Sequence, residues 1–553
     1  MLSIDQPKMT KRFKTLLFLL IIWLTATSFN ITKAVYIDDI STINIGRYLL
    51  QDLKKPNQAI LKNDRETGIA SENSLTHPPL VPYLGSAVIF FFGENELIFH
   101  IVWSLFTLMA ITFFYLLARH LTKQALLLTF LFIINPAFVP SQNLMLDLPL
   151  VVFTVMFFYF LLRPRDNISN YLIAGISAGL ALLVKYTGLV LVPILTGFLF
   201  LGGKKRLLWI VLIPVGILLL WSAQNYLEFR GLHLISNSST GFGSHVLEKS
   251  LLWIIVIGSV SPFSIFLIPS LLRKKSGILL FLSILLSAVF LVLRFLTGQN
   301  EEMVKWILRT LFLTNGLVVL IITLNSISEI FLRYLNEKKL YDLKLASIAF
   351  WFILMTIVLI FSVPFMAVRH VLTVIPALLL LIGATGKIHF DLKYGIIGIF
   401  VIIIHTLLLA IGDNSQADSY RKGAAAITRQ IEHKYGFIKN KYRVWSGGFY
   451  GWRWYTVQEG LMAYNPQKDD LRSGDLLVLT SLYPVQINPL HQNNLILDFE
   501  MTVPRDKFSV VSTMTNWPHN AVGYYYLPTI RDLPYEILPQ HPLEKISVYR
   551  FER

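Results

Sequence analysis

The sequence contains no cysteine, and few of its residues are charged. The lack of cysteine excludes disulfide bonds, thiolate metal ligands and cysteine nucleophiles, and it leaves the redox compartment open. Charged residues make up 15% of the 553 residues, whereas soluble globular domains carry roughly 25%. The chain also shows no internal repeat and no low-complexity segment. The scarcity of charge excludes an ordinary soluble domain and points to a chain built for a lipid environment.

Hydrophobic residues are abundant instead. They make up 54% of the chain, and the mean hydropathy is +0.58. The 39 phenylalanines, 23 tyrosines and 11 tryptophans fit a protein whose rings lie at membrane interfaces. The net charge of +16 comes largely from short loops between apolar runs, so it reflects membrane topology rather than nucleic-acid binding. We therefore expect a polytopic helical protein of the plasma membrane, with the lipid bilayer as a partner and no nucleic acid.

The apolar runs predict about thirteen transmembrane helices. A basic N-terminus precedes the run 16–31, which we interpret as a first span rather than a cleaved signal peptide, because the Thr-Ala-Thr-Ser stretch is a mediocre cleavage site. The next run, 78–92, starts with two prolines and falls short of the roughly 20 residues of a span, so we predict a surface helix. The remaining predicted spans are 97–118, 124–142, 148–163, 171–184, 188–202, 206–224, 250–271, 277–296, 304–326, 345–364, 370–386 and 393–412.

Loop charge supports this count. Basic residues fill all six connections that it places in the cytoplasm, whereas the external connections are mixed or acidic. Counting 78–92 as a span would put three basic loops outside. The positive-inside rule thus predicts a cytoplasmic N-terminus and an external C-terminal segment. The cytoplasmic connections are 119–123, 163–165, 202–206, 273–275, 333–344 and 387–393, and the external ones are 34–96, 141–149, 225–249 and 297–303.

The composition changes abruptly after residue 412. Residues 413–553 are polar and turn-rich, and about 140 residues suffice to bury a separate core. Period-2 patterns predict strands at 475–480, 508–511 and 546–549, and a helical pattern covers 419–434. We therefore predict a membrane domain over 1–412, with a first external loop at 34–96, followed by a small extracytoplasmic α/β domain over 413–553.

Several polar residues gather at the external ends of the predicted spans. Each has a structural explanation when taken alone: an acidic pair in a solvated loop, an N-cap, a cation that snorkels, or a histidine before two prolines. Asp147 is the hardest to explain in this way, because a charge near the hydrocarbon costs on the order of 2.5–3.5 kcal/mol. Together the residues predict a site. They are Asp38, Asp39, Arg47, His77, Asp147, Lys185, Tyr186, Arg369 and His370.

Acids and cations at one membrane face suit chemistry on an anionic lipid headgroup. A lysine and an arginine hold a phosphate and stabilise charge on a leaving group. A carboxylate takes the proton of an acceptor hydroxyl as general base. A second carboxylate orients the first, binds sugar hydroxyls or helps to ligate a hard divalent cation. The sequence leaves open whether such a metal takes part, and no cofactor is certain.

At these positions the chain resembles the GT-C membrane glycosyltransferases of the protein O-mannosyltransferase and lipid A aminoarabinose transferase type, glycosyltransferase family 39 and its relatives. Five elements match in order, over roughly residues 15–410. Three depart slightly from the family pattern: Asp39 where the family often has Glu, one residue inserted before Pro149, and His370 in place of Tyr. The elements are Asp38-Asp39 with Arg47-Tyr48-Leu49-Leu50, His77-Pro78-Pro79-Leu80, Asp147-Leu148-Pro149, Lys185-Tyr186-Thr187-Gly188, and Arg369-His370 with Pro376.

The resemblance implies a glycosyltransferase that uses a polyprenyl-phosphate-linked sugar outside the cytoplasm, generally with inversion. The acceptor is a glycan, a lipid or a protein. Asp38 is then the candidate general base, assisted by Asp39 and Asp147, and these acids are also the ligands of any divalent cation. Lys185 and Arg369 face the donor phosphate. His77 lines the cavity, and Arg47, Tyr186 and His370 complete the predicted substrate-binding residues.

Two other classes remain as alternatives. A secondary transporter or lipid flippase usually shows internal repeats and polar residues near mid-membrane, whereas this chain concentrates its charges at one face. A non-catalytic membrane scaffold would leave the acidic cluster without a purpose. The aromatic stretch 445–455 either stacks on sugar rings or packs within the C-terminal segment or against the membrane, and the packing interpretation is favoured.

Overall fold

A computed structural model gives the fold of most of the chain. The structure describes residues 11–67, 77–231, 243, 245–267, 283–285, 288–289, 303–388, 392–436, 443–448, 450–466, 470–482, 487–515, 522–539 and 541–552. Most of the predicted span 277–296 lies outside these residues, as do the loop charges at 273–275.

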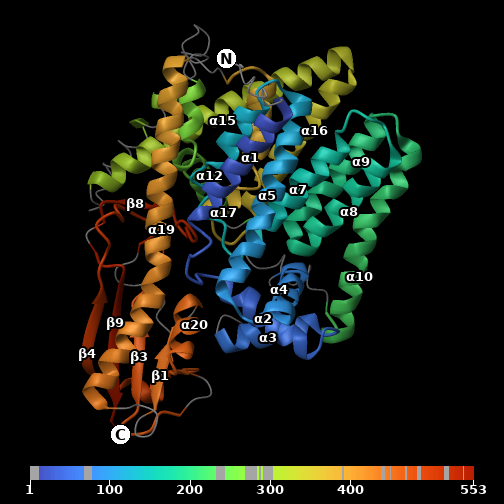
Figure 1. Cartoon of the computed structure of the whole chain (residues 1–553). Coiled ribbons are helices and arrows are strands. Elements are labelled where there is room, and N and C mark those ends of the chain that lie inside the picture. The colour runs from blue at the N-terminus through green and yellow to red at the C-terminus, as the bar shows by residue number, and fades with distance from the viewer. Residues whose placement is uncertain are drawn as a thin grey trace, which may run out of the picture.

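Apolar helices dominate the first three quarters of the chain (Figure 1). Within the described residues, five helices are long and apolar enough to cross a membrane, at Glu96–Leu121, Lys205–Phe229, Met303–Glu337, Leu340–Ser362 and Gly395–Tyr435. The multi-pass helical class is thus confirmed, whereas the count of thirteen stays a prediction. The helices of this part are α1 (Lys11–Ser28), α5 (Glu96–Leu121), α6 (Ala125–Ile133), α7 (Asp147–Leu161), α8 (Ile168–Val184), η1 (Tyr186–Val190), α9 (Leu191–Leu201), η2 (Lys205–Val211), α10 (Leu212–Phe229), α12 (Val246–Ser259), η3 (Pro262–Leu267), α15 (Met303–Glu337), α16 (Leu340–Ser362), α17 (Val368–Val371), α18 (Ile375–Ala384) and α19 (Leu392–Tyr435).

Among the predicted spans that are interrupted, two adjoin predicted site residues, Asp147 and Arg369. The run 124–142 forms α6 and then an irregular segment, 134–146, that contains Pro136 and Pro140. Proline lacks the amide that a helix interior needs, which explains why the helix ends there. The run 370–386 is divided into the single turn α17 and the helix α18. Both interruptions expose backbone groups to partners from distant parts of the chain.

Three short helices, α2 (Asp39–Gln51), α3 (Pro56–Thr67) and α4 (Leu80–Phe92), form a layer at one end of the bundle (Figure 1). The 13 residues of α4 span about 20 Å, which is too short for a hydrocarbon core of about 30 Å. A Cβ on Gly46 would meet the Ser86 amide nitrogen at 2.9 Å, so glycine lets α2 and α4 touch. The Ser86 hydroxyl donates to the Gly46 carbonyl at 2.8 Å. Helix α4 thus packs closely against α2, and its position along the membrane surface stays a prediction.

Helix α19 connects the bundle to the C-terminal part. Its 44 residues include both the predicted span 393–412 and the predicted helix 419–434 as one continuous helix. The predicted domain boundary at 412 therefore lies inside this helix. Figure 1 shows α19 running from the bundle alongside the C-terminal strands, which lie at the same end of the molecule as α2, α3 and α4.

The C-terminal sheet region, residues 443–552, contains a five-stranded sheet of order β2-β1-β3-β9-β4. Strand β1 runs parallel to β2 and β3, and β9 pairs antiparallel with both β3 and β4. Two of the three predicted strand segments, 475–480 and 546–549, thus lie side by side in this sheet. The elements are β1 (Val444–Gly447), α20 (Tyr450–Gln458), β2 (Met462–Ala463), β3 (Leu476–Thr480), α21 (Pro489–Gln492), β4 (Leu495–Val503), β5 (Val511–Ser512), β6 (Met514–Thr515), β7 (Val522–Gly523), β8 (Glu536–Ile537) and β9 (Glu544–Phe551).

The aromatic stretch 445–455 is mostly packed inside this region. Trp445, Trp452, Trp454 and Tyr455 are all buried. Their position agrees with the packing interpretation of this stretch rather than with an exposed sugar-stacking surface.

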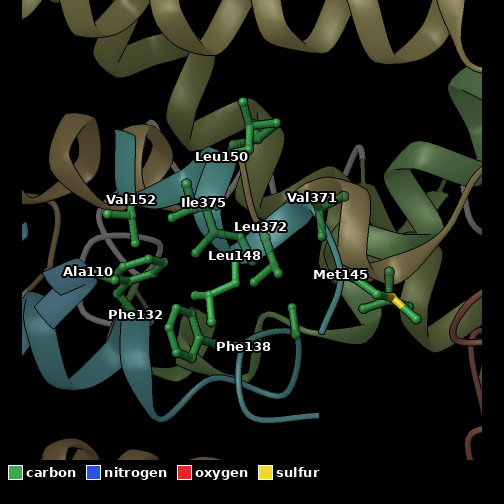
Figure 2. Packing of buried hydrophobic residues seen from close by; sticks show 14 of the residues in the cluster. Ala110, Phe132, Phe138, Met145, Leu148, Leu150, Val152, Val371, Leu372 and Ile375 are labelled. Atoms are coloured by element: carbon green, nitrogen blue, oxygen red, sulfur yellow. The ribbon is translucent and has the colours of Figure 1, made fainter. Parts of the chain in front are cut away.

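One apolar core includes sequence neighbours of the predicted site residues, and Figure 2 shows part of its packing. It joins side chains of the interrupted segments to the helices on either side, and the neighbours of two predicted site residues take part. Leu148 follows Asp147, and Val371 and Leu372 follow Arg369 closely. The labelled residues of this core are Ala110, Phe132, Phe138, Met145, Leu148, Leu150, Val152, Val371, Leu372 and Ile375. Close packing holds such side chains in fixed positions, so the core fixes where the adjoining charged residues point.

Candidate functional site

Four of the predicted site residues form one chain of ion pairs. An Nη1 of Arg369 donates to Asp38 Oδ2 at 2.9 Å, and Arg369 Nε lies 3.7 Å from Asp147 Oδ2. The Lys185 ammonium donates to Asp147 Oδ1 at 3.1 Å. Arg369 therefore bridges two carboxylates, and Lys185 neutralises the second one. The structure thus brings together residues from four separate parts of the sequence.

Asp38 is the accessible carboxylate of this chain. It is the N-cap residue of α2, and its side chain is 39% exposed. Ile37, just before it, has a φ of +47°, a left-handed conformation that is strained for a β-branched residue. This turn directs the chain abruptly from the buried segment 33–37 into α2 and presents the carboxylate of Asp38 to Arg369.

Asp147 is the buried carboxylate, with a side chain only 4% exposed. It is the first residue of α7, but Leu146 is the N-cap and no side chain caps the helix. The alternative interpretation of Asp147 as an N-cap is therefore wrong: its oxygens face cations. Pro149 in the first turn fits the helix start, where its missing amide costs nothing. A buried carboxylate requires such partners, because an unpaired charge away from water is costly.

Lys185 and Arg369 both stand where helices end or begin. Lys185 is the extended C-cap of α8, and the next segment turns back so tightly that a Cβ on Gly188 would meet the Ala181 backbone at 2.6 Å. Arg369 lies in the single turn α17, and its guanidinium also contacts the Met145 sulfur at 2.9 Å. The Lys-x-x-Gly spacing thus serves a compact turn that holds the ammonium beside Asp147.

Asp39 has a different role from the one predicted. It is fully buried, and its two carboxylate oxygens accept the backbone amides of Tyr36 at 3.0 Å and Leu144 at 2.7 Å. Burial raises its pKa to about 7, although nearby Lys33 and these two amides act in the opposite direction. Asp39 therefore ties the loop before α2 to the irregular segment 134–146, and it leaves Asp38 as the accessible member of the acidic pair.

The other predicted substrate-binding residues lie in different surroundings. The His370 ring stacks at a tilt near Phe365, with 5.7 Å between centroids, directly beside Arg369. His77 is half-buried at the start of α4 and is close enough to His370 to interact with it electrostatically. Tyr186 accepts a hydrogen bond from the Trp221 indole at 2.8 Å, so its hydroxyl faces α10. The Arg47 guanidinium pairs with Glu94, an exposed residue just after α4.

Sequence reasoning missed a buried cluster next to this site. The ammonium of Lys33 contacts the Asp413 carboxylate, the Asn143 amide oxygen and, at 3.2 Å, the Pro140 carbonyl. Lys33 and Asp413 are each 1% exposed. The signal available was a charge directly after the first apolar run and another directly after the last. Flanking charges of this kind normally snorkel into water, which is why the pairing escaped notice.

Cationic and amide donors face both oxygens of Asp39 and Asp147 and the Oδ2 oxygen of Asp38. Asp38 and Asp147 face Arg369 and Lys185, and Asp39 accepts two backbone amides. This arrangement does not fit a divalent cation held between the acids. Among the described residues, no group of three or more His, Asp or Glu side chains is placed to hold a metal ion. The arrangement instead suits the recognition of an anion by Arg369 and Lys185 with a carboxylate at its side.

The fold and this site define a multi-pass helical membrane protein that holds two carboxylates and two cations at one end of its bundle. Residues 76–223 match the family of dolichyl-phosphate-mannose-protein mannosyltransferases. The matched part contains His77, Asp147, Lys185 and Tyr186, but neither Asp38 nor Arg369. The resemblance to GT-C glycosyltransferases predicted from the sequence is thereby confirmed. No curated protein matches the chain at a significant level.

Three solved structures are among those to which the chain is similar. ArnT from Cupriavidus metallidurans bound to undecaprenyl phosphate is 14% identical, with a TM-score of 0.44 over 85% of this chain and 94% of that one. The oligosaccharyltransferase AglB from Archaeoglobus fulgidus, with an inhibitory peptide and a dolichol-phosphate, is 14% identical, with a TM-score of 0.41 over 83% and 65%. The Pmt1-Pmt2 complex of S. cerevisiae is 16% identical, with a TM-score of 0.30 over 40% and 34%.

Proposed function

We propose that this protein is a glycosyltransferase that moves a sugar from a polyprenyl-phosphate-linked donor to an acceptor hydroxyl on the extracytoplasmic side of the membrane. The observation that carries the proposal is the single guanidinium of Arg369, which joins the accessible Asp38 to the buried Asp147. The match of residues 76–223 to a family that uses a dolichyl-phosphate sugar supports the class of donor. A secondary transporter or lipid flippase remains the alternative.

Arg369 and Lys185 bind the donor phosphate in this proposal. Both lie beside the deeply buried Asp147, whose carboxylate holds their side chains in place before the donor arrives. An arginine presents a planar set of donors that matches phosphate oxygens, and a lysine adds a point charge. As the bond between the anomeric carbon and the phosphate oxygen breaks, the electron pair stays on the polyprenyl phosphate. The two cations stabilise the negative charge that develops there.

Asp38 acts as the general base. The acceptor hydroxyl attacks the anomeric carbon from the face opposite the phosphate, so the configuration inverts, and the hydroxyl proton passes to the Asp38 carboxylate. Because Asp38 and Arg369 form an ion pair at 2.9 Å, donor binding comes before proton transfer in this proposal. A bound phosphate competes with Asp38 for the Arg369 guanidinium. Asp38 then loses its ion-pair partner, and its carboxylate is free to take the proton of the acceptor only when the donor is present.

The predicted topology places this reaction on the external side. The short helix α4 does not cross the bilayer in this scheme, so the ends of α2, α7 and α8 that carry the site share a side with the C-terminal sheet region (Figure 1). That side is extracytoplasmic if the basic connections, such as 202–206, face the cytoplasm. The N-terminus is then cytoplasmic.

Two measurements test the proposal together. Mass spectrometry of cell-envelope glycans from cells with and without the gene should show one glycoform that depends on the gene. Purified protein in detergent should then release polyprenyl phosphate from a polyprenyl-phosphate sugar only when the matching acceptor is added. An envelope that does not change with the gene, together with purified protein that moves a labelled lipid between vesicle leaflets, would support the flippase alternative instead.

A further inference from the structure

The backbone on both sides of the Asp38–Arg369 pair is held by the C-terminal sheet region. On the arginine side, Met366 and Leu527 exchange backbone hydrogen bonds of 3.2 Å and 2.8 Å, and the Val368 amide donates to the Tyr524 carbonyl at 2.8 Å. The residue that follows Val368 is Arg369. A segment of the C-terminal sheet region therefore lies against the strand that leads directly into α17.

On the aspartate side, helix α20 makes the contact. A Cβ on Gly451 would come within 2.0 Å of the Val35 carbonyl oxygen, so only a glycine permits this approach. Tyr450 has a φ of +58°, another left-handed residue, and it is close enough to both Asp38 and Arg369 for their charges to affect the pKa of its hydroxyl. The loop that carries Asp38 is thus backed by the same region of the chain that backs Arg369.

One buried cluster connects these two contacts. The Lys33 cluster consists of Lys33, Asn143, Asp413, Thr513 and Tyr525. The Tyr525 hydroxyl donates to Asp413 at 2.9 Å and accepts from the Asn143 amide at 2.9 Å. The Thr513 hydroxyl donates to the other Asp413 oxygen at 2.9 Å, and the Lys33 ammonium lies between Asn143 and Asp413. The cluster therefore joins α19, the loop after α1, the segment 134–146 and the C-terminal sheet region.

Two members of the Lys33 cluster are adjacent in sequence to residues whose backbone groups hold the site. Tyr525 follows Tyr524, whose carbonyl holds the Val368 amide. Asn143 precedes Leu144, whose amide holds the Asp39 carboxylate. Loss of a hydrogen bond within the cluster would consequently displace Arg369 through Tyr524 and Asp38 through Leu144.

We infer that the Lys33 cluster is a positioning device for the proposed donor site, in which the C-terminal sheet region sets the distance between Asp38 and Arg369. The inference rests on the proposed function, because it assigns a purpose to that distance. Lys33, Asp413 and Tyr525 are positioning residues: they act through the backbone contacts at Val368 and Leu144. Burying a charged pair this deeply costs free energy, because both ions lose their hydration. Such a pair is useful where it selects one packed arrangement over others.

The absence of cysteine makes a direct test possible. Met366 and Leu527 form a hydrogen-bonded antiparallel pair, for which Cα atoms lie about 5.5 Å apart, and this separation suits a disulfide. In a Met366→Cys/Leu527→Cys protein, the rate of disulfide formation reports how closely the C-terminal sheet region is packed against the segment before α17. The matched control is Glu500→Cys/Ser547→Cys, a cross-strand pair in the β4–β9 ladder.

We expect Lys33→Met to slow disulfide formation at the Met366/Leu527 pair about tenfold and to leave the control pair unchanged. The same substitution should weaken binding of undecaprenyl phosphate, the probe, about tenfold and raise the donor KM more than it lowers kcat. Tyr525→Phe, which keeps the ring, should act in the same direction but less strongly. Tyr535→Phe, which loses hydroxyl contacts to Ser259 and His405 elsewhere between this region and the helices, should change none of these values.

The decisive part of the experiment asks whether the disulfide restores binding in the Lys33→Met protein. Once the disulfide between positions 366 and 527 has formed, Lys33→Met protein should bind undecaprenyl phosphate within about threefold of the wild type, and reduction should abolish this gain. The inference is wrong if Lys33→Met leaves the rate of disulfide formation unchanged, or if the disulfide forms and binding is not restored. Wild-type protein that neither binds the probe nor transfers sugar would refute the proposed function, and the disulfide rates would still decide whether the cluster seats the region.

Discussion

Asp38 and Arg369 meet at 2.9 Å although 331 residues separate them in the chain. The same guanidinium lies 3.7 Å from Asp147, so one arginine joins an accessible carboxylate to a buried one. In the proposed reaction this arginine has two successive partners, Asp38 in the resting protein and the donor phosphate in the complex.

Replacing Arg369 should mainly affect the donor. In Arg369→Ala the phosphate loses charge-assisted hydrogen bonds worth about 1.5–3 kcal/mol each, so we expect the donor KM to rise by roughly tenfold to a hundredfold. Arg369→Lys keeps the charge but not the planar set of donors, and it should recover only part of the loss. Steady-state kinetics at varied donor concentration measure both effects. An unchanged donor KM in Arg369→Ala would contradict the phosphate role.

Replacing Lys185 should affect both stability and the donor. Lys185→Ala leaves the buried Asp147 with Arg369 as its remaining partner at 3.7 Å. Removing one member of a buried pair costs about 3–5 kcal/mol, so the melting temperature in detergent should fall. The double variant Lys185→Met/Asp147→Leu should regain most of that stability without regaining use of the donor. Recovery of normal donor kinetics in the double variant would show that the pair serves folding alone.

The sequence was sufficient to predict the four residues of the ion-pair chain. Asp38, Asp147, Lys185 and Arg369 stand beside apolar runs where a charge is costly, and loop charge placed all of them at one face. The shortness of α4 was equally predictable, because span length is a matter of counting residues. Both inferences depend only on local composition and on the dimensions of a bilayer.

Pairings between distant segments were not predictable in this way. Nothing near Lys33 indicates that its partner is Asp413, because that contact exists only after α1, α19 and the segment 134–146 have packed together. Asp39 looked equivalent to Asp38, yet a turn at Ile37 sends one carboxylate inward and the other outward. The continuity of α19 across the predicted boundary was hidden for a different reason: its composition changes from apolar to polar although its backbone does not.

The membrane topology can be tested with single cysteines, since the chain has none. Lys54→Cys between α2 and α3, and Gln492→Cys in the C-terminal sheet region, should both react with a membrane-impermeant maleimide in right-side-out vesicles. Both side chains are exposed. Lys205→Cys, in a basic connection and also exposed, should react only after the vesicles are opened. Labelling of Lys54→Cys and Gln492→Cys from opposite sides would overturn the single-face site.

The stability of the protein should depend on pH through Asp39. Burial raises the pKa of this carboxyl from 3.8 to about 7 in the folded protein, so between these values the folded state binds more protons than the unfolded state. The free energy of unfolding should therefore fall as the pH rises from about 4 to about 7. Asp39→Asn should reduce this slope. Part of the slope should persist, because burial also raises the pKa of Glu544 to about 7.

The central claim is that Asp38 takes the proton of the acceptor. The most direct measurement is the rate of sugar transfer by purified Asp38→Asn protein, with donor and acceptor saturating and with binding of undecaprenyl phosphate recorded on the same sample. Loss of a general base lowers the rate by about 10²–10⁴-fold, and we predict a loss of this size in kcat while the protein still folds and binds the lipid phosphate. Asp38→Asn protein that transfers sugar at the wild-type rate would contradict the account.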